Sequence, residues 1–354
     1  MRDILYVLAT PHFFSEGMCG RVSHAIGFVR GMTENGVSVR VVSGPDPEGF
    51  LKESKSHSSI ESRLFFYFRV AWALAVAKES RAVIRWRPVL PFILFPIIFY
   101  KRKMMDVFWE INGVTGKNSR FPIVRWISSV SIWLANLTGA AVVVSESSAK
   151  GLRQAGWSRK LFVIRNGYDS TVSWPDIEAQ RGTPISLVYF GAFQRYYDWN
   201  VLISVYEQAR ESGLVSNLMI WGFEREFNVS GIEVMGRFNI HELPKSLSGL
   251  VNPALVLHTD DSQLSYEGSP MKLYEYLSTG LPVVVSDSQR EKISANFHVY
   301  WYKAGCGKSL KEAIFMVSSR YEEALQLSRG NVFLAESLGS WGVVTREFAE
   351  LVNN

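Results

Sequence analysis

Short apolar runs rich in Val and Ile alternate along this chain with stretches whose apolar residues recur every three or four positions. The first pattern is typical of buried strands and the second of amphipathic helices. Strands are predicted at Ile4–Ala9, Val37–Val42, Asp106–Gly113, Ala140–Ser145, Ile185–Phe190, Leu218–Trp221, Ile232–Met235, Leu255–Leu257 and Val283–Val285. Helices are predicted at Arg21–Met32, Phe121–Leu137, Val201–Arg210 and Trp341–Val352. The alternation predicts parallel sheets flanked by helices, in the α/β class.

The length of the chain leaves room for two such sheets. Its 354 residues are enough for two α/β domains of about 150–200 residues each. Residues 170–184 are polar and irregular, which is typical of a linker between domains. We therefore expect a first domain at 1–169, the linker at 170–184 and a second domain at 185–340. Ligands of open α/β sheets lie beyond the carboxyl ends of the strands, so we expect the site in the crevice between the domains.

The stretch Tyr266–Ser286, YEGSPMKLYEYLSTGLPVVVS, carries both the start and the stop signals of a short helix. Ser269 is a good N-cap, and Pro270 suits the first helical position because its missing N–H costs nothing there. Gly280 can adopt the left-handed conformation that closes a helix, and Pro282 blocks its continuation. A run of three valines then predicts a strand buried on both faces.

The charged residues of this short helix suggest anion binding. Leu273, Tyr276 and Leu277 share the core face, whereas Glu275 points away from it. Lys272 lies in the first turn, where the helix dipole disfavours a cation. An anion held on the free N–H groups of residues 271–273 would reverse that penalty. The alternative is an ordinary surface pair between Lys272 and Glu275.

Glu267 precedes Glu275 by eight positions, next to the segment Ser269–Val284, SPMKLYEYLSTGLPVV. This arrangement resembles the E-x7-E signature of retaining glycosyltransferases with the GT-B fold, of the family 4 type, in its SPMKLYEYLATGLPVV variety. The resemblance implies two Rossmann-like parallel-sheet domains that face each other across a cleft. It also implies that the last helix, 341–354, packs back toward the N-terminal domain.

The same resemblance implies roles for individual residues. Glu275 would bind the ribose hydroxyls of a nucleotide sugar. Glu267 would lie beside the transferred sugar and stabilise positive charge at its anomeric carbon. The diphosphate would be held at the start of the helix, by Gly268, Ser269, Met271, Lys272 and Leu273.

Two segments of the first half also resemble this family. CGRVSHA (Cys19–Ala25) is similar to its GGxxxH loop, in which Gly20 would let the backbone approach the donor phosphates or the acceptor. His24 either lines the cleft or packs within its helix. DVFWEING (Asp106–Gly113) is similar to the family's E-x-H/N-G segment. Asn112 stands where many members carry His, so it implies hydrogen bonding rather than a general base.

Gly191 and Ala192 follow the first strand of the second domain. The resemblance places here a G-R…K pair that binds the diphosphate, but Ala192 occupies the usual Arg position. Arg195 either substitutes, because a guanidinium matches phosphate oxygens bidentately, or is a surface residue. Gly191 and Arg195 are both candidate donor-binding residues.

Metal chemistry is not expected. No Asp-x-Asp sequence occurs, the six histidines lack metal-ligand spacing, and Cys19 and Cys306 are isolated. We expect no cofactor besides the nucleoside-diphosphate sugar that serves as donor, and no metal. Helix N–H groups and Lys272 or Arg195 would then stabilise the leaving diphosphate.

The charge of the chain is unevenly distributed. Residues 1–170 contain 23 Lys and Arg against 12 Asp and Glu, whereas residues 171–354 contain 15 against 21. The basic first half indicates an anionic partner, for which a lipid headgroup or a charged acceptor fits better than nucleic acid, because no nucleic-acid motif accompanies it. The apolar segments Leu64–Ala77 and Pro88–Tyr100 are too short to span a bilayer and are interpreted as buried core, with a membrane-resting face as the alternative.

Together these features predict a retaining, metal-independent glycosyltransferase that acts on a glycan or lipid-linked acceptor in bacterial-type surface polysaccharide or glycolipid synthesis. The two cysteines and the absence of a signal-peptide pattern favour a cytoplasmic protein, peripheral to the inner face of the cell membrane. The alternative is a nucleotide-sugar-binding or scaffold subunit with weak or no transferase activity. An epimerase of nucleotide sugars lacks supporting motifs.

Overall fold

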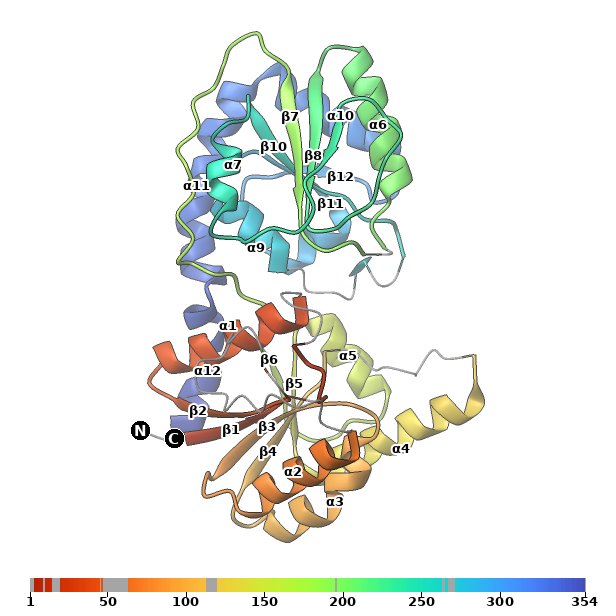
Figure 1. Ribbon diagram of the computed structural model, residues 1–354, viewed down its shortest axis with the longest axis vertical. Helices are drawn as coiled ribbons and strands as arrows, with labels where there is room; N and C mark the ends of the chain where they lie inside the picture. The colour runs from red at the N-terminus through yellow and green to blue at the C-terminus, as the bar shows by residue number, and fades with distance from the viewer. Residues whose placement is uncertain are drawn as a thin grey trace. The chain divides into compact units, whose positions relative to one another are not determined.

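A computed structural model describes residues 3–8, 10–14, 20–44, 46, 63–112, 120–194, 196–262, 265–266 and 271–353. The chain divides into two compact units (Figure 1). Unit 1 contains Met1–Asn166 and Trp341–Asn354, and unit 2 contains Gly167–Ser340. The irregular segment 170–184 therefore groups with unit 2 rather than standing apart from both units.

Unit 1 is a parallel sheet of six strands covered by helices on both faces. The strands are β1 (Asp3–Val7), β2 (Ser38–Val42), β3 (Arg81–Arg85), β4 (Asp106–Glu110), β5 (Ala140–Val143) and β6 (Leu161–Val163), in the order β2-β1-β3-β4-β5-β6. The helices are α1 (Gly20–Glu34), α2 (Arg63–Ala75), α3 (Leu90–Lys101), α4 (Pro122–Thr138), α5 (Glu146–Gln154) and α12 (Trp341–Asn353). Helices α1 and α12 cover one face, and α2, α3 and α4 cover the other (Figure 1).

Unit 2 repeats this architecture with a second parallel sheet of six strands. The strands are β7 (Ile185–Phe190), β8 (Val215–Trp221), β9 (Ile232–Val234), β10 (Pro253–Leu257), β11 (Val283–Ser286) and β12 (Tyr300–Tyr302), in the order β12-β11-β10-β7-β8-β9. The helices are α6 (Trp199–Glu211), α7 (Leu243–Leu247), α9 (Met271–Ser278), α10 (Gly307–Ser319) and α11 (Tyr321–Gly339), with a short 3₁₀ helix, η1 (Asp287–Lys292).

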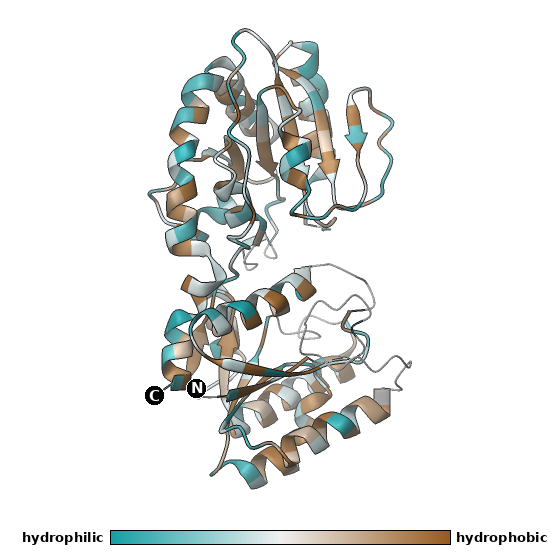
Figure 2. Ribbon diagram, turned by 60° about the vertical axis from the view of Figure 1, so that its left-hand side comes forward, coloured by the Kyte–Doolittle hydropathy of each residue, from teal (hydrophilic) through white to brown (hydrophobic). Residues whose placement is uncertain are grey.

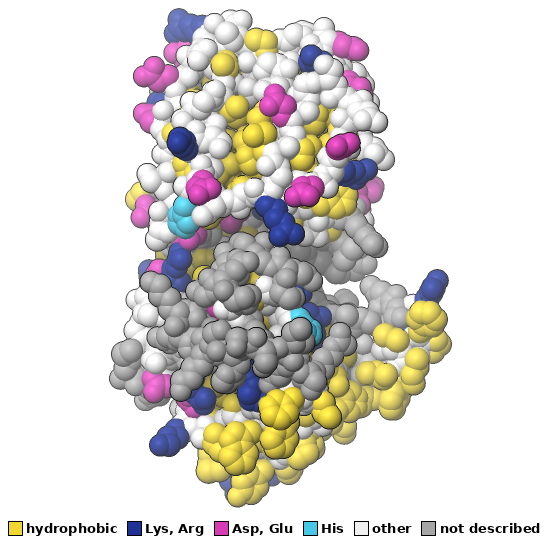
Figure 3. Space-filling view, viewed as in Figure 1, with side chains coloured by type: hydrophobic (Ala, Val, Ile, Leu, Met, Phe, Trp, Pro, Cys, Tyr) yellow, Lys and Arg dark blue, Asp and Glu magenta, His cyan; other side chains and the backbone are white. Residues whose placement is uncertain are grey.

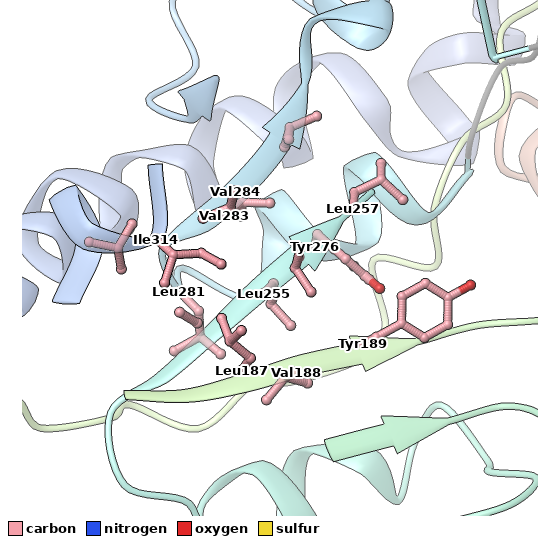
Figure 4. Close-up of a cluster of buried hydrophobic side chains, with 14 of the residues drawn as sticks. Leu187, Val188, Tyr189, Leu255, Leu257, Tyr276, Leu281, Val283, Val284 and Ile314 are labelled. Atoms are coloured by element: carbon pink, nitrogen blue, oxygen red, sulfur yellow. The ribbon is translucent and has the colours of Figure 1, made fainter. Parts of the chain in front are cut away.

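The core of unit 2 is built on its three central strands. Every residue of β7, β10 and β11 is buried, as expected for parallel strands covered on both faces. In the pairing, Leu255 lies opposite both Val283 and Val188 (Figure 4). Brown, hydrophobic stretches mark strands of both sheets in Figure 2, and each unit has its own cluster of buried hydrophobic residues.

The last helix belongs to unit 1, where α12 packs closely against α1. A side chain on Gly27 or Gly31 would overlap with Trp341, so these two glycines, one turn apart, let the helices approach. Phe348 of α12 completes an aromatic cluster, with its ring centre 6.1 Å from that of Phe28 and 5.0 Å from that of Phe108.

The interpretation of the two apolar segments as buried core is only half right. They form α2 and α3, and one side of each helix is buried, as at Phe66, Val70 and Leu94. The opposite side is exposed to solvent: Phe68 is 67% exposed and Tyr100 is 79% exposed. A helix that packs on one face of a sheet buries only one of its own sides. In α2 and α3 the exposed side is apolar as well.

Candidate functional site

Three glycines in left-handed or related conformations mark the carboxyl edge of the unit 2 sheet. Gly191 (φ 139°), Gly222 (φ 115°) and Gly236 (φ 72°) follow β7, β8 and β9. The N–H of Gly191 donates to the carbonyl of Trp221 (2.9 Å), and the N–H of Gly222 donates to the carbonyl of Gly236 (2.6 Å). A side chain on Gly222 would overlap with the Gly191 carbonyl. The segments that follow these strands therefore pack closely on one another at the edge where open α/β sheets bind ligands.

Lys272, in the first turn of α9, extends across Gly191 to this edge. Its ammonium donates hydrogen bonds to the Tyr189 hydroxyl (2.6 Å), the Ala192 carbonyl (3.0 Å) and the Tyr197 hydroxyl (3.2 Å). It also lies 4.8 Å and 4.6 Å from the ring centres of the two tyrosines. Any side chain at Gly191 would overlap with the Lys272 stem. The expected anion-binding cation thus lies at the loop where Ala192 stands at the position expected to carry an Arg.

Burial shifts the pKa values of both charged residues of α9 toward neutrality. It lowers the pKa of Lys272 to about 7, although Glu275 opposes this shift. It raises the pKa of Glu275 to about 7, with Lys272 opposing and Asp169 reinforcing the shift. A nearby anion would favour the ammonium again. Displaced pKa values of this size concentrate at functional sites.

Glu275 has the environment expected of a ligand-binding carboxylate. Its side chain is half-buried, and among the described residues it makes no hydrogen bond and no ion pair. The prediction that Leu273 and Leu277 form the core face is confirmed, because they are 1% and 0% exposed. A half-buried carboxylate without a protein partner can accept hydrogen bonds from a ligand.

Helix α9 is fixed to the end of β7 by a tyrosine that the sequence pattern assigned only to the core. The Tyr276 hydroxyl accepts a hydrogen bond from the N–H of Phe190 and donates one to its carbonyl, both at 3.0 Å. The hydroxyl therefore satisfies the last backbone groups of the strand (Figure 4). At the other end, Trp174 donates to the Ser278 hydroxyl (3.0 Å). The start of α9 is thereby held at the carboxyl edge of the sheet.

His258, which the sequence analysis did not single out, lies beside Lys272. It is 1% exposed, neither ring nitrogen has a hydrogen-bond partner among the described residues, and burial lowers its pKa to about 3. Its ring centre is 4.3 Å from that of Trp199, 5.4 Å from that of Tyr197 and 5.5 Å from that of Tyr189. A neutral imidazole therefore completes the aromatic surroundings of the ammonium.

The segment that leads to Glu267 is anchored by polar groups. The Asp260 carboxylate accepts hydrogen bonds from the hydroxyls of Ser262 (2.5 Å) and Ser265 (2.6 Å). Lys292 donates to the Ser265 carbonyl (2.6 Å), and burial lowers the pKa of this lysine to about 8. Glu267 itself lies outside the described residues, so its proposed role stays a prediction.

Unit 1 has its own polar cluster at the carboxyl ends of β1, β3 and β4. The buried Glu110 carboxylate accepts hydrogen bonds from the Tyr6 hydroxyl (2.6 Å) and the Asn112 amide (2.7 Å). It also lies 3.4 Å from the Arg85 guanidinium and 3.1 Å from Nε2 of His24. Burial alone would raise the pKa of Glu110, but Arg85 and His24 hold it well below its usual range. The carboxylate is therefore the hub of this cluster.

The described residues that were predicted for the site are divided between the two units. Gly191, Met271, Lys272, Leu273 and Glu275 lie together at one edge of the unit 2 sheet. Asn112 and Gly20 belong to unit 1.

Asn112 joins the Glu110 cluster, and no described residue comes within 4 Å of the place that a side chain on Gly20, the first residue of α1, would take. His24 is buried, with Nδ1 2.6 Å from the Asn166 side-chain oxygen. Glu267, Gly268, Ser269 and Arg195 are outside the described residues.

Unit 2 also has a cavity that lies apart from this edge. A cavity of about 460 Å³ lies near the beginning of β7, lined by segments 179–184, 213–214 and 318–323. This is the amino end of the sheet, opposite to the end where α/β sheets bind ligands.

Among the described residues, no three His, Cys, Asp or Glu side chains gather as metal ligands would. That the reaction needs no metal stays a prediction.

No family model matches the chain. In sequence it is 30% identical over 116 residues to EpsF of Bacillus subtilis (strain 168), which carries a provisional glycosyltransferase assignment. That match covers 33% of this chain and only 23% of EpsF.

Solved structures match along the whole chain. The HepE protein of Anabaena, in complex with UDP and glucose, superposes with a TM-score of 0.71 at 12% identity, covering 100% of both chains. Sucrose-phosphate synthase from Thermosynechococcus elongatus gives a TM-score of 0.66 at 12% identity, covering 100% of this chain and 98% of that one. The predicted fold class is confirmed: the two six-stranded parallel sheets with flanking helices are those of the GT-B fold.

Proposed function

We propose that this protein is a glycosyltransferase that moves a sugar from a nucleoside diphosphate to a hydroxyl of a glycan or lipid-linked acceptor. The observation that carries the proposal is the start of α9, where the Lys272 ammonium lies at the glycine-lined edge of a GT-B domain and the Glu275 carboxylate makes no hydrogen bond or ion pair among the described residues. The partial sequence match to EpsF supports the same activity. The pairing of Lys272 with Glu275 suits a nucleotide, which offers anionic phosphates and ribose hydroxyls side by side.

Each group of α9 has a proposed role in donor binding. The N–H groups of Met271, Lys272 and Leu273 have no intrahelical partners and bind the diphosphate oxygens at the positive end of the helix. A bound diphosphate favours the charged form of Lys272, whose ammonium then adds positive charge at Ala192, where the family pattern has an Arg. Glu275 accepts hydrogen bonds from the ribose hydroxyls. Arg195 stays a second candidate cation.

For the chemical step we propose retention without a metal. Glu267 stabilises the positive charge that develops at the anomeric carbon as the bond to the diphosphate breaks. The acceptor oxygen attacks from the same face, and its proton passes to the departing phosphate oxygen. Asn112 contributes hydrogen bonding only, since an amide cannot act as a base. The diphosphate charge is taken up by the helix N–H groups and Lys272.

The product stereochemistry tests this step. An α-linked nucleotide sugar is expected to give an α-linked product, read from the anomeric coupling in the NMR spectrum. An inverting reaction needs a base on the opposite face, and His24 is buried in unit 1, with Nδ1 2.6 Å from the Asn166 side-chain oxygen and Nε2 3.1 Å from the Glu110 carboxylate. A β-anomeric product would contradict retention and would return His24 to consideration as the base.

The donor is tested by thermal stability in the presence of nucleotides. We expect UDP or a UDP-sugar to raise the melting temperature more than GDP or dTDP, because structures of HepE contain UDP, glucose and UDP-glucose. A ligand at one hundred times its Kd stabilises by about 2.7 kcal/mol. If no nucleotide shifts the melting temperature, the proposed donor site is wrong.

One observation favours the scaffold alternative: the three N–H donors of Lys272 are all engaged by protein oxygens. A phosphate would have to replace one of these acceptors. Incubation with nucleotide sugars separates the two functions, because slow hydrolysis of the donor requires an active centre, whereas a scaffold would bind without turnover. We further propose that the protein acts in surface polysaccharide or glycolipid synthesis, in the cytoplasm and on the inner face of the membrane.

Glu275→Gln tests the ribose contact. The substitution is expected to weaken binding of the best nucleotide by about 1–3 kcal/mol, as for a hydrogen bond to a charged group. The folded protein should not suffer, because burial disfavours this carboxylate and the amide has the same size. Isothermal calorimetry measures the affinity, and Glu312→Gln, at an exposed site on α10, is the matched control. Equal affinities of both variants would contradict the assignment.

A further inference from the structure

The outer sides of α2, α3 and α4 carry a set of large exposed aromatic residues. Trp72 is 62% exposed, Trp126 is 60% exposed and Trp133 is 58% exposed. We define the aromatic face of unit 1 by six residues: Phe68, Trp72, Phe99, Tyr100, Trp126 and Trp133. Because α3 packs against both α2 and α4, the three helices present one continuous surface, which is yellow in Figure 3. Contiguous apolar surface of this kind marks an interaction site.

Helix α4 shows that this exposure is more than incidental. Three of its five buried residues are polar (Ser128, Ser131 and Thr138, beside Ile132 and Ala135), whereas its exposed side contains Ile123, Trp126 and Trp133. A helix on a water-facing surface has the opposite arrangement, with apolar residues turned to the core. The outside of α4 is thus more apolar than its inside. Such a helix is suited to apolar surroundings on its outer side.

The charged residues of the three helices are all basic. None of the three helices contains an Asp or a Glu. Lys101, Arg102 and Lys103 follow one another at the end of α3, and the Arg102 guanidinium lies 4.0 Å from the Phe99 ring centre. Arg85, although it precedes α3 in the sequence, lies inside unit 1 beside Glu110 and takes no part in this basic region. The basic rim is therefore the end of α3.

We infer that the aromatic face inserts into one leaflet of a bilayer that contains anionic phospholipids. Trp, Tyr and Phe are the residues that favour the membrane interface, and neighbouring basic residues attract anionic headgroups. The helices must lie in the plane of the membrane, since α3 has only 12 residues. Within the described part of the chain, no helix is both long and apolar enough to cross a bilayer.

The basic rim favours lipid over a second copy of this chain. Two copies that met through this face with two-fold symmetry would bring equal surfaces together, and each surface has basic but no acidic residues on its helices. Like charges at an interface oppose association. The inference rests on unit 1 alone and does not depend on the sugar-transfer reaction.

Co-sedimentation with vesicles of phosphatidylcholine and about 30% phosphatidylglycerol tests the inference. We expect binding at low salt and substantial binding at about 1 M salt, because screening removes only the electrostatic part. The double variant Trp126→Ser/Trp133→Ser should bind at least about tenfold more weakly at both salt concentrations. Phe333→Ser, at a 73% exposed position on α11, is the matched control and should bind as the original protein does.

The folded state of the variants is checked by far-UV circular dichroism and melting temperature, which exposed substitutions should leave unchanged. Three results would overturn the inference: no vesicle binding at low salt, equal binding of the double variant and the control, or binding that is lost entirely at high salt. Light scattering offers a fourth test. If the original protein is a dimer and the double variant is a monomer, a second copy of the chain, and not lipid, covers the aromatic face. Loss of vesicle binding with nucleotide binding intact would separate this face from the proposed donor site.

Discussion

Lys272→Met is expected to weaken nucleotide binding at least about tenfold while it stabilises the protein at neutral pH. The loss of affinity follows from removing a charged hydrogen-bond donor to the diphosphate, worth about 1.5–3 kcal/mol. The gain in stability, about 1 kcal/mol, follows because burial disfavours the ammonium and methionine keeps an unbranched apolar stem over Gly191. Calorimetry measures the affinity, and urea unfolding measures the stability.

The same substitution should remove a pH dependence of stability. The pKa of Lys272 is about 7 in the folded protein against an ordinary value of 10.5, so between these values the unfolded chain binds more protons. The free energy of unfolding should therefore rise with pH across this window, by up to about 1.4 kcal/mol per pH unit from this group. In Lys272→Met this contribution is absent.

The control is Lys308→Met, at an exposed position on α10, which should change neither the affinity nor the pH dependence. The opposite changes in affinity and stability distinguish a binding residue from a structural one. Removing a structural lysine would lower the free energy of unfolding. Removing a lysine that is kept for a ligand should instead raise the free energy of unfolding of the ligand-free protein. Unchanged affinity in Lys272→Met would exclude this ammonium from the donor site.

Much of the fold could be predicted because strong local signals agree with tertiary structure. The strand Ile185–Phe190 was predicted with the bounds it has, and α9 ends at Ser278, before Gly280, which has the predicted left-handed conformation. The strands β3, β6 and β12 were not predicted. β3 has only three apolar residues between two arginines, and β6 and β12 have three residues each, too few to define a period of two.

Which side of α3 faces the core could not be predicted, because its residues are apolar on all sides. An amphipathic pattern shows which side faces the core, but the segment Leu90–Tyr100 offers no polar side to compare. Burial of the whole segment was the simplest interpretation. In the structure, α2 and α4 lie on either side of α3, and one side of it remains exposed.

The donor site was predicted from a motif, but its surroundings were not. Lys272 and Glu275 lie within one turn of a helix, so the sequence brings them together. The aromatic surroundings of the Lys272 ammonium consist of Tyr189, Tyr197 and His258, which come from three separate segments. No spacing relates these positions. Only the chain topology, which brings the ends of β7 and β10 to one edge, unites them.

Glu110→Ala is expected to lower the free energy of unfolding by about 3–5 kcal/mol. The Arg85 guanidinium, 14% exposed, would lose its carboxylate inside unit 1, and the Tyr6 hydroxyl and Asn112 amide would lose their acceptor. Glu34→Ala, at an exposed position at the end of α1, should change stability by no more than about 0.5 kcal/mol. Urea unfolding at neutral pH compares the two variants.

The pH dependence shows whether the charge of Glu110 is responsible. Its folded pKa lies well below the ordinary value of 4.5, so as the pH falls below that value the unfolded chain takes up a proton that the folded protein does not. The stability from this group is present above about pH 4.5 and is lost as the medium becomes more acidic. Glu110→Gln, which keeps the size of the side chain, should lose stability at neutral pH and show a shallower decline in acid. If its acid limb matched that of the original protein, other carboxylates would control acid unfolding, and Glu110 would be a hub of hydrogen bonds rather than of charge.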